Sequence, residues 1–549
     1  MEGTYSRPHS AISQATEEGA SPTCNHAESH LNVDQMLQVV PKRSESPSVT
    51  EETVFIPPPV SSVDAGTNTD PPDKCCERLQ MLWPPRGIIA ALITKVTMAG
   101  VLFGVVWSIT VKECEPGGNL FGIVVLFICA VIAGRLTGLI RLPKLPPFPP
   151  LLGMLLAGIL LRNIPVVTDA VKIDKDWSAA LRTIALAVIL ARAGLGLDGS
   201  ALKKLKGVCM RVGIGPCLIE AATIAVASHF IMGLPWVWGF ILGFVLAAVS
   251  PAVVVPSMLL LQKDGYGVEQ GIPTLLMAAG SFDDILAITG FTTCLGMVSA
   301  TGAAWFNLVR GVLEVLGGMV VGILLGFFLQ YFPSKDQKQV VMKRSFLVLG
   351  LSVFGVFGSN VANFPGSGGL CTLVLAFVAG VGWKESKVPV EEIVGRAWDI
   401  FQPLLFGLIG AEMTFSELDG HTVGLGIAAL IIALAIRLLF TFVMVMCAGF
   451  NFKEKIFIAI AWMPKATVQA AIGSTALDMA RKKQDAELEK YGMDVLTVAV
   501  LSILITAPIG AILIGLMGPY LLQKPKNPSA WGLGGRQSTD TPVTYESAI

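Results

Sequence analysis

A succession of long apolar segments runs through most of this chain, from residue 87 to residue 522. A helix that crosses the hydrocarbon core of a bilayer needs about 20 mostly apolar residues, and segments of suitable length predict about fourteen spans. Hydrophobic residues make up 53% of the chain and charged residues only 15%, which is far from the balance of soluble proteins. The sequence therefore predicts an all-α polytopic membrane protein.

The predicted spans follow one another through short connections. Their approximate ranges are 87–111, 120–140, 148–163, 178–197, 207–232, 236–261, 271–298, 303–332, 346–363, 369–383, 400–415, 423–450, 456–480 and 495–522. Residues 1–86 are polar and rich in Ser, Thr and Pro, so they are predicted to form a disordered tail. A second, short tail is predicted over residues 523–549.

Basic residues gather after the even-numbered spans, which sets the expected orientation in the membrane. The clusters are Arg141 and Lys144; Lys203, Lys204 and Lys206; Lys335, Lys338, Lys343 and Arg344; Lys384 and Lys387; Lys453 and Lys455; and Lys524 and Lys526. The exception is the run 481–483 (RKK) after the thirteenth span, which Asp485, Glu487 and Glu489 dilute. Because loops rich in Lys and Arg stay in the cytoplasm, both tails are predicted to be cytoplasmic. Neither a signal peptide nor an Arg-rich transit peptide is expected, which favours plasma or endosomal and lysosomal membranes, with the mitochondrial inner membrane as the alternative.

The two halves of the membrane region resemble each other, at roughly residues 120–298 and 346–522. Matching residues recur seven spans apart, and an odd number of spans inverts the second copy relative to the first. The matching positions are Ser250 and Pro251 with Pro464 and Lys465, and Glu220 with Arg437. Inverted repeats are typical of transporters, so a transporter is favoured over a receptor.

Proline residues interrupt the sixth and thirteenth spans at corresponding places. Proline removes an intrahelical hydrogen bond and clashes with the carbonyl one turn earlier, so Pro251 and Pro464 predict broken helices with free backbone groups near the middle of the membrane. A simple kink is the alternative for either span taken alone. Two breaks at equivalent positions favour two discontinuous helices that cross.

Two adjacent carboxylates, Asp283 and Asp284, lie in the middle of the seventh span. Ionisable groups at this depth are costly and usually functional. Neighbouring helical residues point about 100° apart, so one carboxylate is expected to bind a cation while the other assists or contacts the crossing helix. The carbonyls of Val249 and Gly280 are candidates to complete an oxygen shell. Burial and mutual repulsion disfavour two ionised carboxylates, so a proton and a cation should compete for the pair.

Other charged residues inside the spans are expected to support this pair. Glu220 and Arg437 are predicted to form a buried salt bridge, because an unpaired guanidinium is costly at mid-span; a purely structural pair is the favoured interpretation. Lys465, after the second break, is placed to neutralise carbonyl ends or the Asp site. Charges near span ends, such as Arg182 and Glu412, are interpreted as structural.

Several classes of function are excluded or disfavoured. The formal net charge is zero, which gives no reason to expect a nucleic-acid partner. The ten cysteines lack the CxxC spacing of metal and redox sites, and no ATP-binding loop is found. The sequence therefore predicts neither an enzyme nor a bound cofactor.

The segments AAVSPAVVVPS, GSFDDILAIT, FQPLLFGLIGAE and WMPKATVQAAIG, together with Arg437, resemble monovalent cation/proton antiporters of the NhaA and NapA type. Among these the chain is most similar to the animal NHA subfamily, the B branch of the mammalian sodium/hydrogen exchangers. The resemblance covers residues 87–522. It implies an elevator-type homodimer, with a dimerisation domain and an ion-translocating core, that exchanges sodium or lithium for protons.

The resemblance also implies roles for particular residues. It assigns ion binding to Asp283 and Asp284, the core salt bridge to Glu220 and Arg437, and a crossing-helix role to Lys465. Arg437 stands where bacterial relatives have Lys, and because arginine is not readily deprotonated, this residue is not expected to carry a transported proton.

We therefore expect a sodium or lithium/proton antiporter whose partners are these ions, membrane lipids and a second copy of the chain. One alternative is a sodium-coupled symporter of an organic anion, which would need a larger polar cavity than the apolar flanks VVVPSMLLL and ILAITGF suggest. The other is a cation channel, which would need a continuous polar pore.

Overall fold

The computed structural model describes residues 87–140, 148–197, 206–299, 304–334, 336–362, 364, 367–383, 386–416 and 420–524. The chain divides after Pro85, and the described residues all belong to the second of its two units. The predicted tails lie outside the described residues, except for residues 523 and 524. So do several of the basic residues used to predict the orientation: Arg141, Lys144, Lys203, Lys204, Lys335, Lys384 and Lys526.

The described residues fold into helices, and no strand occurs among them. In the first half the helices are α2 (Ile88–Thr110), the 3-10 helix η1 (Val111–Cys114), α3 (Asn119–Leu139), α4 (Pro150–Asn163), α5 (Pro165–Ala170), α6 (Lys175–Gly196), α8 (Lys206–Met232), α9 (Trp236–Ala247), α10 (Pro251–Lys263) and α11 (Ile272–Ser299). In the second half they are α12 (Ala304–Tyr331), α13 (Val340–Val361), α14 (Ser367–Trp383), α15 (Lys387–Ala411), α16 (Gly420–Met444), α17 (Phe452–Ala461), α18 (Thr467–Lys483) and α19 (Ala486–Leu521).

Ten segments of the described chain are long and apolar enough to cross a membrane, and the shorter apolar helices α4 and α14 accompany them. One of the ten, Trp236–Lys263, includes both α9 and α10. The chain is thus an all-helical integral membrane protein, as its apolar segments predict.

Two helices begin well before the apolar segments that predicted them. α15 begins at Lys387 rather than at residue 400, and α19 begins at Ala486 rather than at residue 495. Charged residues recur in these first segments, KVPVEEIVGRAWD in α15 and AELEKYGMD in α19, so hydropathy alone does not detect them. The start of α19 has its own local signal, because the side chain of Asp485 accepts hydrogen bonds from the backbone N–H groups of Glu487 and Leu488.

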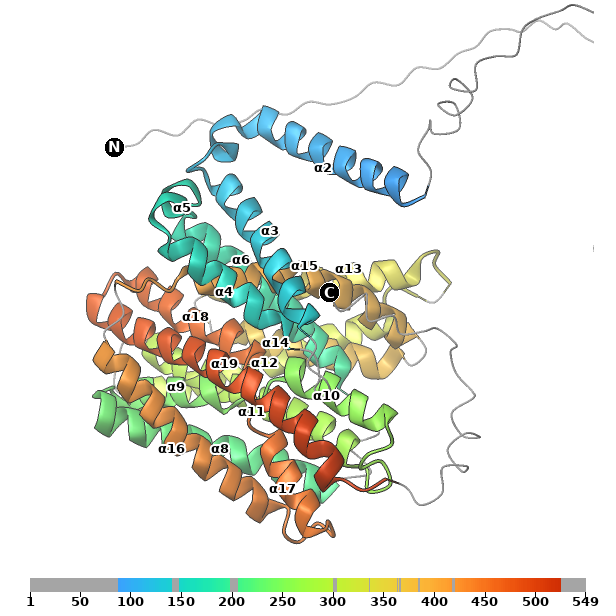
Figure 1. Cartoon of the computed structure of the whole chain (residues 1–549), viewed down its shortest axis with the longest axis vertical. Coiled ribbons are helices and arrows are strands. Elements are labelled where there is room, and N and C mark those ends of the chain that lie inside the picture. The colour runs from blue at the N-terminus through green and yellow to red at the C-terminus, as the bar shows by residue number, and fades with distance from the viewer. Residues whose placement is uncertain are drawn as a thin grey trace, which may run out of the picture. The chain divides into compact units, whose positions relative to one another are not determined.

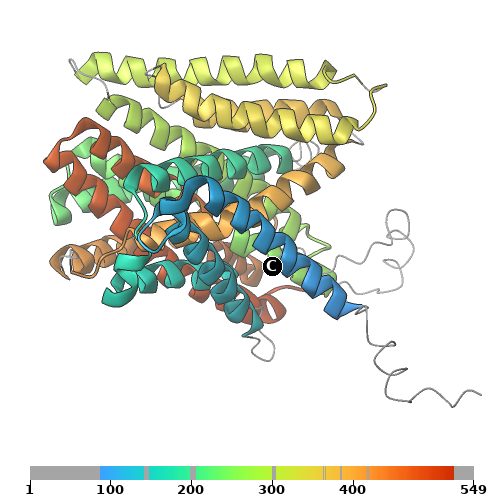
Figure 2. The ribbon, with the colours of Figure 1, turned by 90° about the horizontal axis from the view of Figure 1, so that it is seen from above.

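The helices pack in two groups. The first consists of α8–α11 and α16–α19, and the second consists of α3, α4, α6 and α12–α15; within each group the helices pack mainly against one another. α8 and α16 run side by side in the first group (Figure 1). In the second group, α12 and α13 lie along one edge of the view in Figure 2. The sequential pair α11 and α12 joins the two groups, and α18 contacts α6 and α15.

Helix α2 packs differently from the others. It contacts chiefly η1, and its apolar side chains remain exposed along its length, including Leu92, Val96 and Leu102. A water-soluble protein rarely exposes so large an apolar surface. Lipid or another protein surface must cover this helix.

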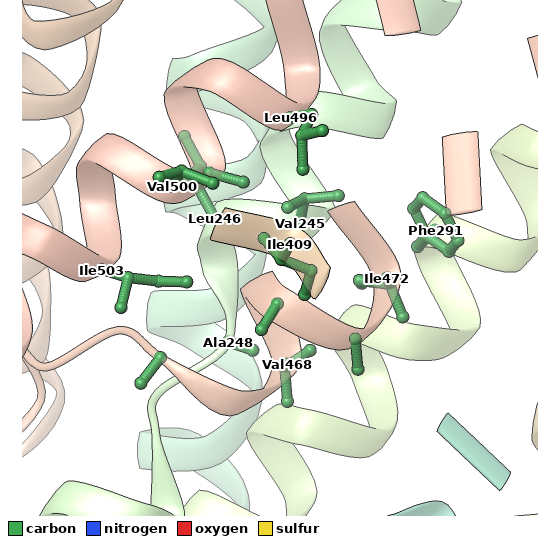
Figure 3. Packing of buried hydrophobic residues seen from close by; sticks show 14 of the residues in the cluster. Val245, Leu246, Ala248, Phe291, Ile409, Val468, Ile472, Leu496, Val500 and Ile503 are labelled. Carbon is green, nitrogen blue, oxygen red and sulfur yellow. The ribbon is translucent and has the colours of Figure 1, made fainter. Parts of the chain in front are cut away.

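Both predicted breaks are present, and they meet. α9 ends at Ala247 and α10 begins at Pro251, while α17 ends at Ala461 and α18 begins at Thr467. Pro251 occupies the first turn of α10, where the missing N–H is not needed. The backbone N–H of Ser250 donates a hydrogen bond of 2.9 Å to the carbonyl of Pro464. Figure 3 shows buried apolar side chains of α9, α18 and α19 packed around this place.

Candidate functional site

Asp283 lies on α11, is fully buried, and is held from two directions. Arg437 of α16 donates from Nη2 to both carboxylate oxygens, at 3.0 Å to Oδ1 and 3.2 Å to Oδ2. The backbone N–H of Val249, in the break between α9 and α10, donates to Oδ2 at 2.7 Å. Asp283 therefore ties α11 to α16 and to the first helix break.

Asp284, the next residue, is only 4% exposed. Among the described residues no hydrogen bond or ion pair reaches its carboxylate, and its Oδ1 is buried without a partner. A buried, ionised carboxylate without a partner is very costly, so this group needs a proton or a cation. The two carboxylates thus differ sharply in their surroundings: Asp283 is held, and Asp284 is available.

Gly280 lies one turn before this pair and is also buried. A Cβ atom added at this position would meet no other atom within 4 Å, apart from the backbone of its own helix. The buried face of α11 therefore has open space next to the carboxylates.

A second carboxylate centre adjoins the first. Glu220 of α8 accepts hydrogen bonds at Oε2 from Arg437 Nη1 and, at 2.6 Å, from Lys465 Nζ. Glu220, Arg437 and Lys465 are all fully buried. Arg437 also donates to the carbonyl of Ala247, at the end of α9. Arg437 thus connects Glu220, Asp283 and the first helix break.

The formal charge of this buried cluster does not balance. Its carboxylates are Asp283, Asp284 and Glu220, and its cations are Arg437 and Lys465, so three negative charges against two positive charges leave one negative charge in excess. The excess belongs to the carboxylate that has no partner, Asp284. One proton or one monovalent cation would neutralise the cluster.

The structure brings the residues selected from the sequence around the meeting point of the two breaks. Ser250, Pro251 and Pro464 form the breaks themselves, and the N–H of Lys465 donates to Thr506 Oγ1 of α19 at 2.9 Å. Val249 contacts Asp283 through its N–H, whereas the sequence suggested its carbonyl as an ion ligand. The backbone at this break thus supplies a donor to the carboxylate.

Sequence reasoning missed Gln469 of α18. This fully buried side chain donates from Nε2 to the carbonyls of Val245, at 3.1 Å, and Ala248, at 2.7 Å. The last carbonyls of a helix have no partner within the helix, and in α9 the break leaves them buried. Figure 3 shows Val245 and Ala248 close to residues of α18. A glutamine in the middle of the predicted thirteenth span was the available signal, but it carries no charge and did not stand out.

Sequence reasoning also did not assemble an ion-pair cluster that joins the two helix groups. Arg182 of α6 pairs with Glu412, which caps α15, at 2.7 Å, and with Asp478 of α18 at 2.6 Å. Arg481 of α18 pairs with Glu412 at 2.9 Å. These contacts link α18, in the first group, to α6 and α15 in the second.

The comparisons with known proteins agree with this architecture. Residues 123–522 match the protein family described as "Sodium/hydrogen exchanger, transmembrane". The chain is 66% identical to sodium/hydrogen exchanger 9B2 of Homo sapiens over 447 residues, which cover 81% of this chain and 83% of the relative. It is 55% identical to sodium/hydrogen exchanger 9B1 of Homo sapiens over 446 residues, covering 81% and 86% respectively.

A solved structure shares the fold. It is that of the sodium proton antiporter MjNhaP1 from Methanocaldococcus jannaschii, with a TM-score of 0.56 and 18% sequence identity. The match covers 78% of this chain and 99% of the antiporter. At this identity the likeness concerns the fold alone.

Proposed function

This chain belongs to the transmembrane sodium/hydrogen exchanger family, and we propose that it exchanges sodium for protons at the buried cluster around Asp284. It is a transporter and not an enzyme. The resemblance to the B branch of the mammalian exchangers is confirmed, and the identity to 9B2 exceeds that to 9B1. Because the chain belongs to an exchanger family, we set aside the sodium-coupled symporter and the cation channel as alternatives.

The observation that carries the site proposal is the unpartnered carboxylate of Asp284 in a cluster with one excess negative charge. Either a proton or a sodium ion neutralises this charge, and both cannot do so at once. A cluster that is left charged is expensive to move through a hydrocarbon-lined barrier, so only the loaded states cross readily. Competition for one carboxylate is therefore sufficient for exchange, and lithium, which is also a hard monovalent cation, is expected to serve as a substrate.

The two carboxylates have different roles. Asp283 keeps its bonds to Arg437 and Val249 and holds α11 against the break, while Asp284 binds the transported ion together with oxygen atoms near Gly280. Glu220 and Lys465 set the electrostatic surroundings of Arg437. Because Arg437 has an anionic partner on each side, it stays a fixed cation throughout the cycle.

We assign alternating access to a relative movement of the two helix groups. The group of α8–α11 and α16–α19 contains the whole charged cluster, so it is the ion-translocating core of an elevator mechanism; the other group is the scaffold. The crossed breaks fit inverted repeats at residues 120–298 and 346–522 and a total of fourteen crossings, with α9–α10 and α17–α18 each counted once. The ion pairs that cross between the groups, Arg182 with Asp478 and Arg481 with Glu412, must rearrange when the core moves.

We further propose that the exchanger works as a homodimer, with both tails in the cytoplasm, in plasma or endosomal and lysosomal membranes. The exposed apolar length of α2 supports an environment of lipid and a second copy of the chain. No residue of the charged cluster lies on α2, and α2 belongs to neither helix group, so we place α2 outside the ion pathway.

The decisive experiment is flux in proteoliposomes. A sodium or lithium pulse should dissipate an imposed pH gradient with the wild-type protein, and Asp284→Asn should abolish this response because an amide cannot balance the charge of a cation. Asp169→Asn, at an exposed position of α5, is the matched control and should behave as wild type. Normal exchange by folded Asp284→Asn would refute the proposed site.

A further inference from the structure

We infer that the missing side chain at Gly280 makes the room for the transported cation, so that this residue selects cations by size. The inference rests on the proposed function and goes one step beyond it, since it assigns specificity to a position rather than binding. It is carried by the position of the two aspartates on the helix, by the open space beside Gly280 and by the cost of a glycine in a helix.

The helix geometry places Gly280 on the same face of α11 as both aspartates. At about 100° per residue, the direction of position 280 lies between those of the pair, roughly 40° from Asp284 and 60° from Asp283. Side chains of an α-helix also tilt back toward its N-terminus. The Cα–Cβ bonds of Asp283 and Asp284 therefore tilt toward the turn that Gly280 occupies, and their carboxyl atoms stay more than 4 Å from a Cβ built at that glycine.

The surroundings of Gly280 differ from those of other glycines near the site. A Cβ at Gly290, on the same helix, would lie 2.3 Å from the ring of Phe244, and one at Gly213 would lie 2.9 Å from the Cβ of Phe282. Close packing explains those two glycines. At Gly280 no atom comes within 4 Å of such a Cβ, although the residue is buried.

Packing therefore gives no reason for a glycine at position 280. In a helix interior glycine is less favourable than alanine, because it loses more backbone freedom on folding. A buried helical glycine beside open space lowers stability without improving any contact. The lost helix stability is therefore offset by a functional gain, the open space near the unpartnered carboxylate of Asp284.

A methyl group at position 280 would enter the space that the cation occupies. A larger cation loses more of its fit than a smaller one, so sodium should be affected more than lithium. One methylene of a substrate in a hydrophobic pocket is discriminated by about 10–200-fold; taking the low end of that scale for a methyl group against a cation, Gly280→Ala should raise the ratio of sodium KM to lithium KM about tenfold. The helix itself should become more stable.

The test compares Gly280→Ala with wild type in proteoliposomes, with lithium, sodium and potassium pulses and with thermal unfolding of the purified protein. The matched control is Gly350→Ala, at an exposed position of α13 where a Cβ also meets no atom within 4 Å. The expected result is a raised melting temperature for both variants and a changed sodium to lithium ratio for Gly280→Ala only.

An unchanged ratio in Gly280→Ala would overturn the inference, and so would a failure of this variant to fold, since the space would then not be open to a methyl group. Asp284→Asn, measured in parallel, separates the two proposals. If Asp284→Asn abolishes exchange while Gly280→Ala keeps the wild-type ratio, only the size selection is wrong. If Asp284→Asn exchanges normally, the site itself is wrong.

Discussion

Replacing Gln469 by methionine should uncouple the end of α9 from the helix that crosses it. Methionine has a similar size, so packing is largely retained, but both amide hydrogen bonds to Val245 and Ala248 are lost. The carbonyl of Ala248 directly precedes the N–H of Val249, which holds Asp283. Gln469 thus supports the backbone donor of the proposed ion site from the opposite helix.

The expected cost follows from the burial of the two carbonyls. A buried polar group that loses its hydrogen-bond partner costs about 1–3 kcal/mol, so two carbonyls place the destabilisation of Gln469→Met at about 2–6 kcal/mol. Transport should suffer as well, because a small displacement of a positioned group can reduce a rate about a hundredfold. We expect sodium/proton turnover to fall at least about tenfold by the same argument.

The assay is thermal unfolding of the purified variant, together with sodium-driven proton flux in proteoliposomes. Gln330→Met is the matched control, because Gln330 of α12 also donates its amide to a backbone carbonyl, that of Val378, at 2.6 Å, but lies in the scaffold group. The control should lose stability and keep the wild-type sodium KM and turnover. If Gln469→Met transports as well as Gln330→Met, Gln469 has no positioning role and the reasoning is refuted.

Two further predictions concern the buried charges. Reversing both charges (Glu220→Arg with Arg437→Glu) should destabilise the protein less than the sum of the two single reversals, with a coupling energy of about 1 kcal/mol or more. Recovery remains partial because Arg437 also pairs with Asp283. Additive losses in thermal unfolding would count against the Glu220–Arg437 pair. Arg182→Met removes one cation from Glu412 and Asp478 and should lower the free energy of unfolding by about 3–5 kcal/mol. The control Arg396→Met breaks an exposed pair with Glu392 and should cost about 0–1 kcal/mol. Equal losses in thermal unfolding would show that the ion-pair cluster between the helix groups is not specially stabilising.

The spans and the broken helices could be predicted because their causes are local. Apolar length marks a span wherever it occurs, and proline at positions 251 and 464 acts on its own helix. The first parts of α15 and α19 were not predicted, because charged residues lower their mean hydropathy below that of a membrane span.

The charged residues of the site could be selected from the sequence, but their partners could not. Charges inside spans are rare enough to stand out, which identified Asp283, Asp284, Glu220, Arg437 and Lys465. Which of the two aspartates has a free carboxylate depends on how α16 and the first break approach α11, and this requires coordinates.

The long-range partners of uncharged or peripheral residues could not be predicted either, because they too depend on how the helices pack. Arg182 meets Glu412 and Asp478 across separations of 230 and 296 residues, and no sequence pattern encodes this meeting. Gln469 is neutral and follows a helix break, so its importance appears only when the carbonyls of α9 are seen to depend on it.

The central claim is that one carboxylate, Asp284, binds either a proton or a sodium ion. It is tested most directly by adding sodium to the purified exchanger in weakly buffered solution and measuring the protons released with a pH indicator. The wild-type protein should release protons as sodium saturates the site, while Asp284→Asn should release none and Asp169→Asn should match wild type. Proton release by folded Asp284→Asn at the wild-type sodium concentration would contradict the account.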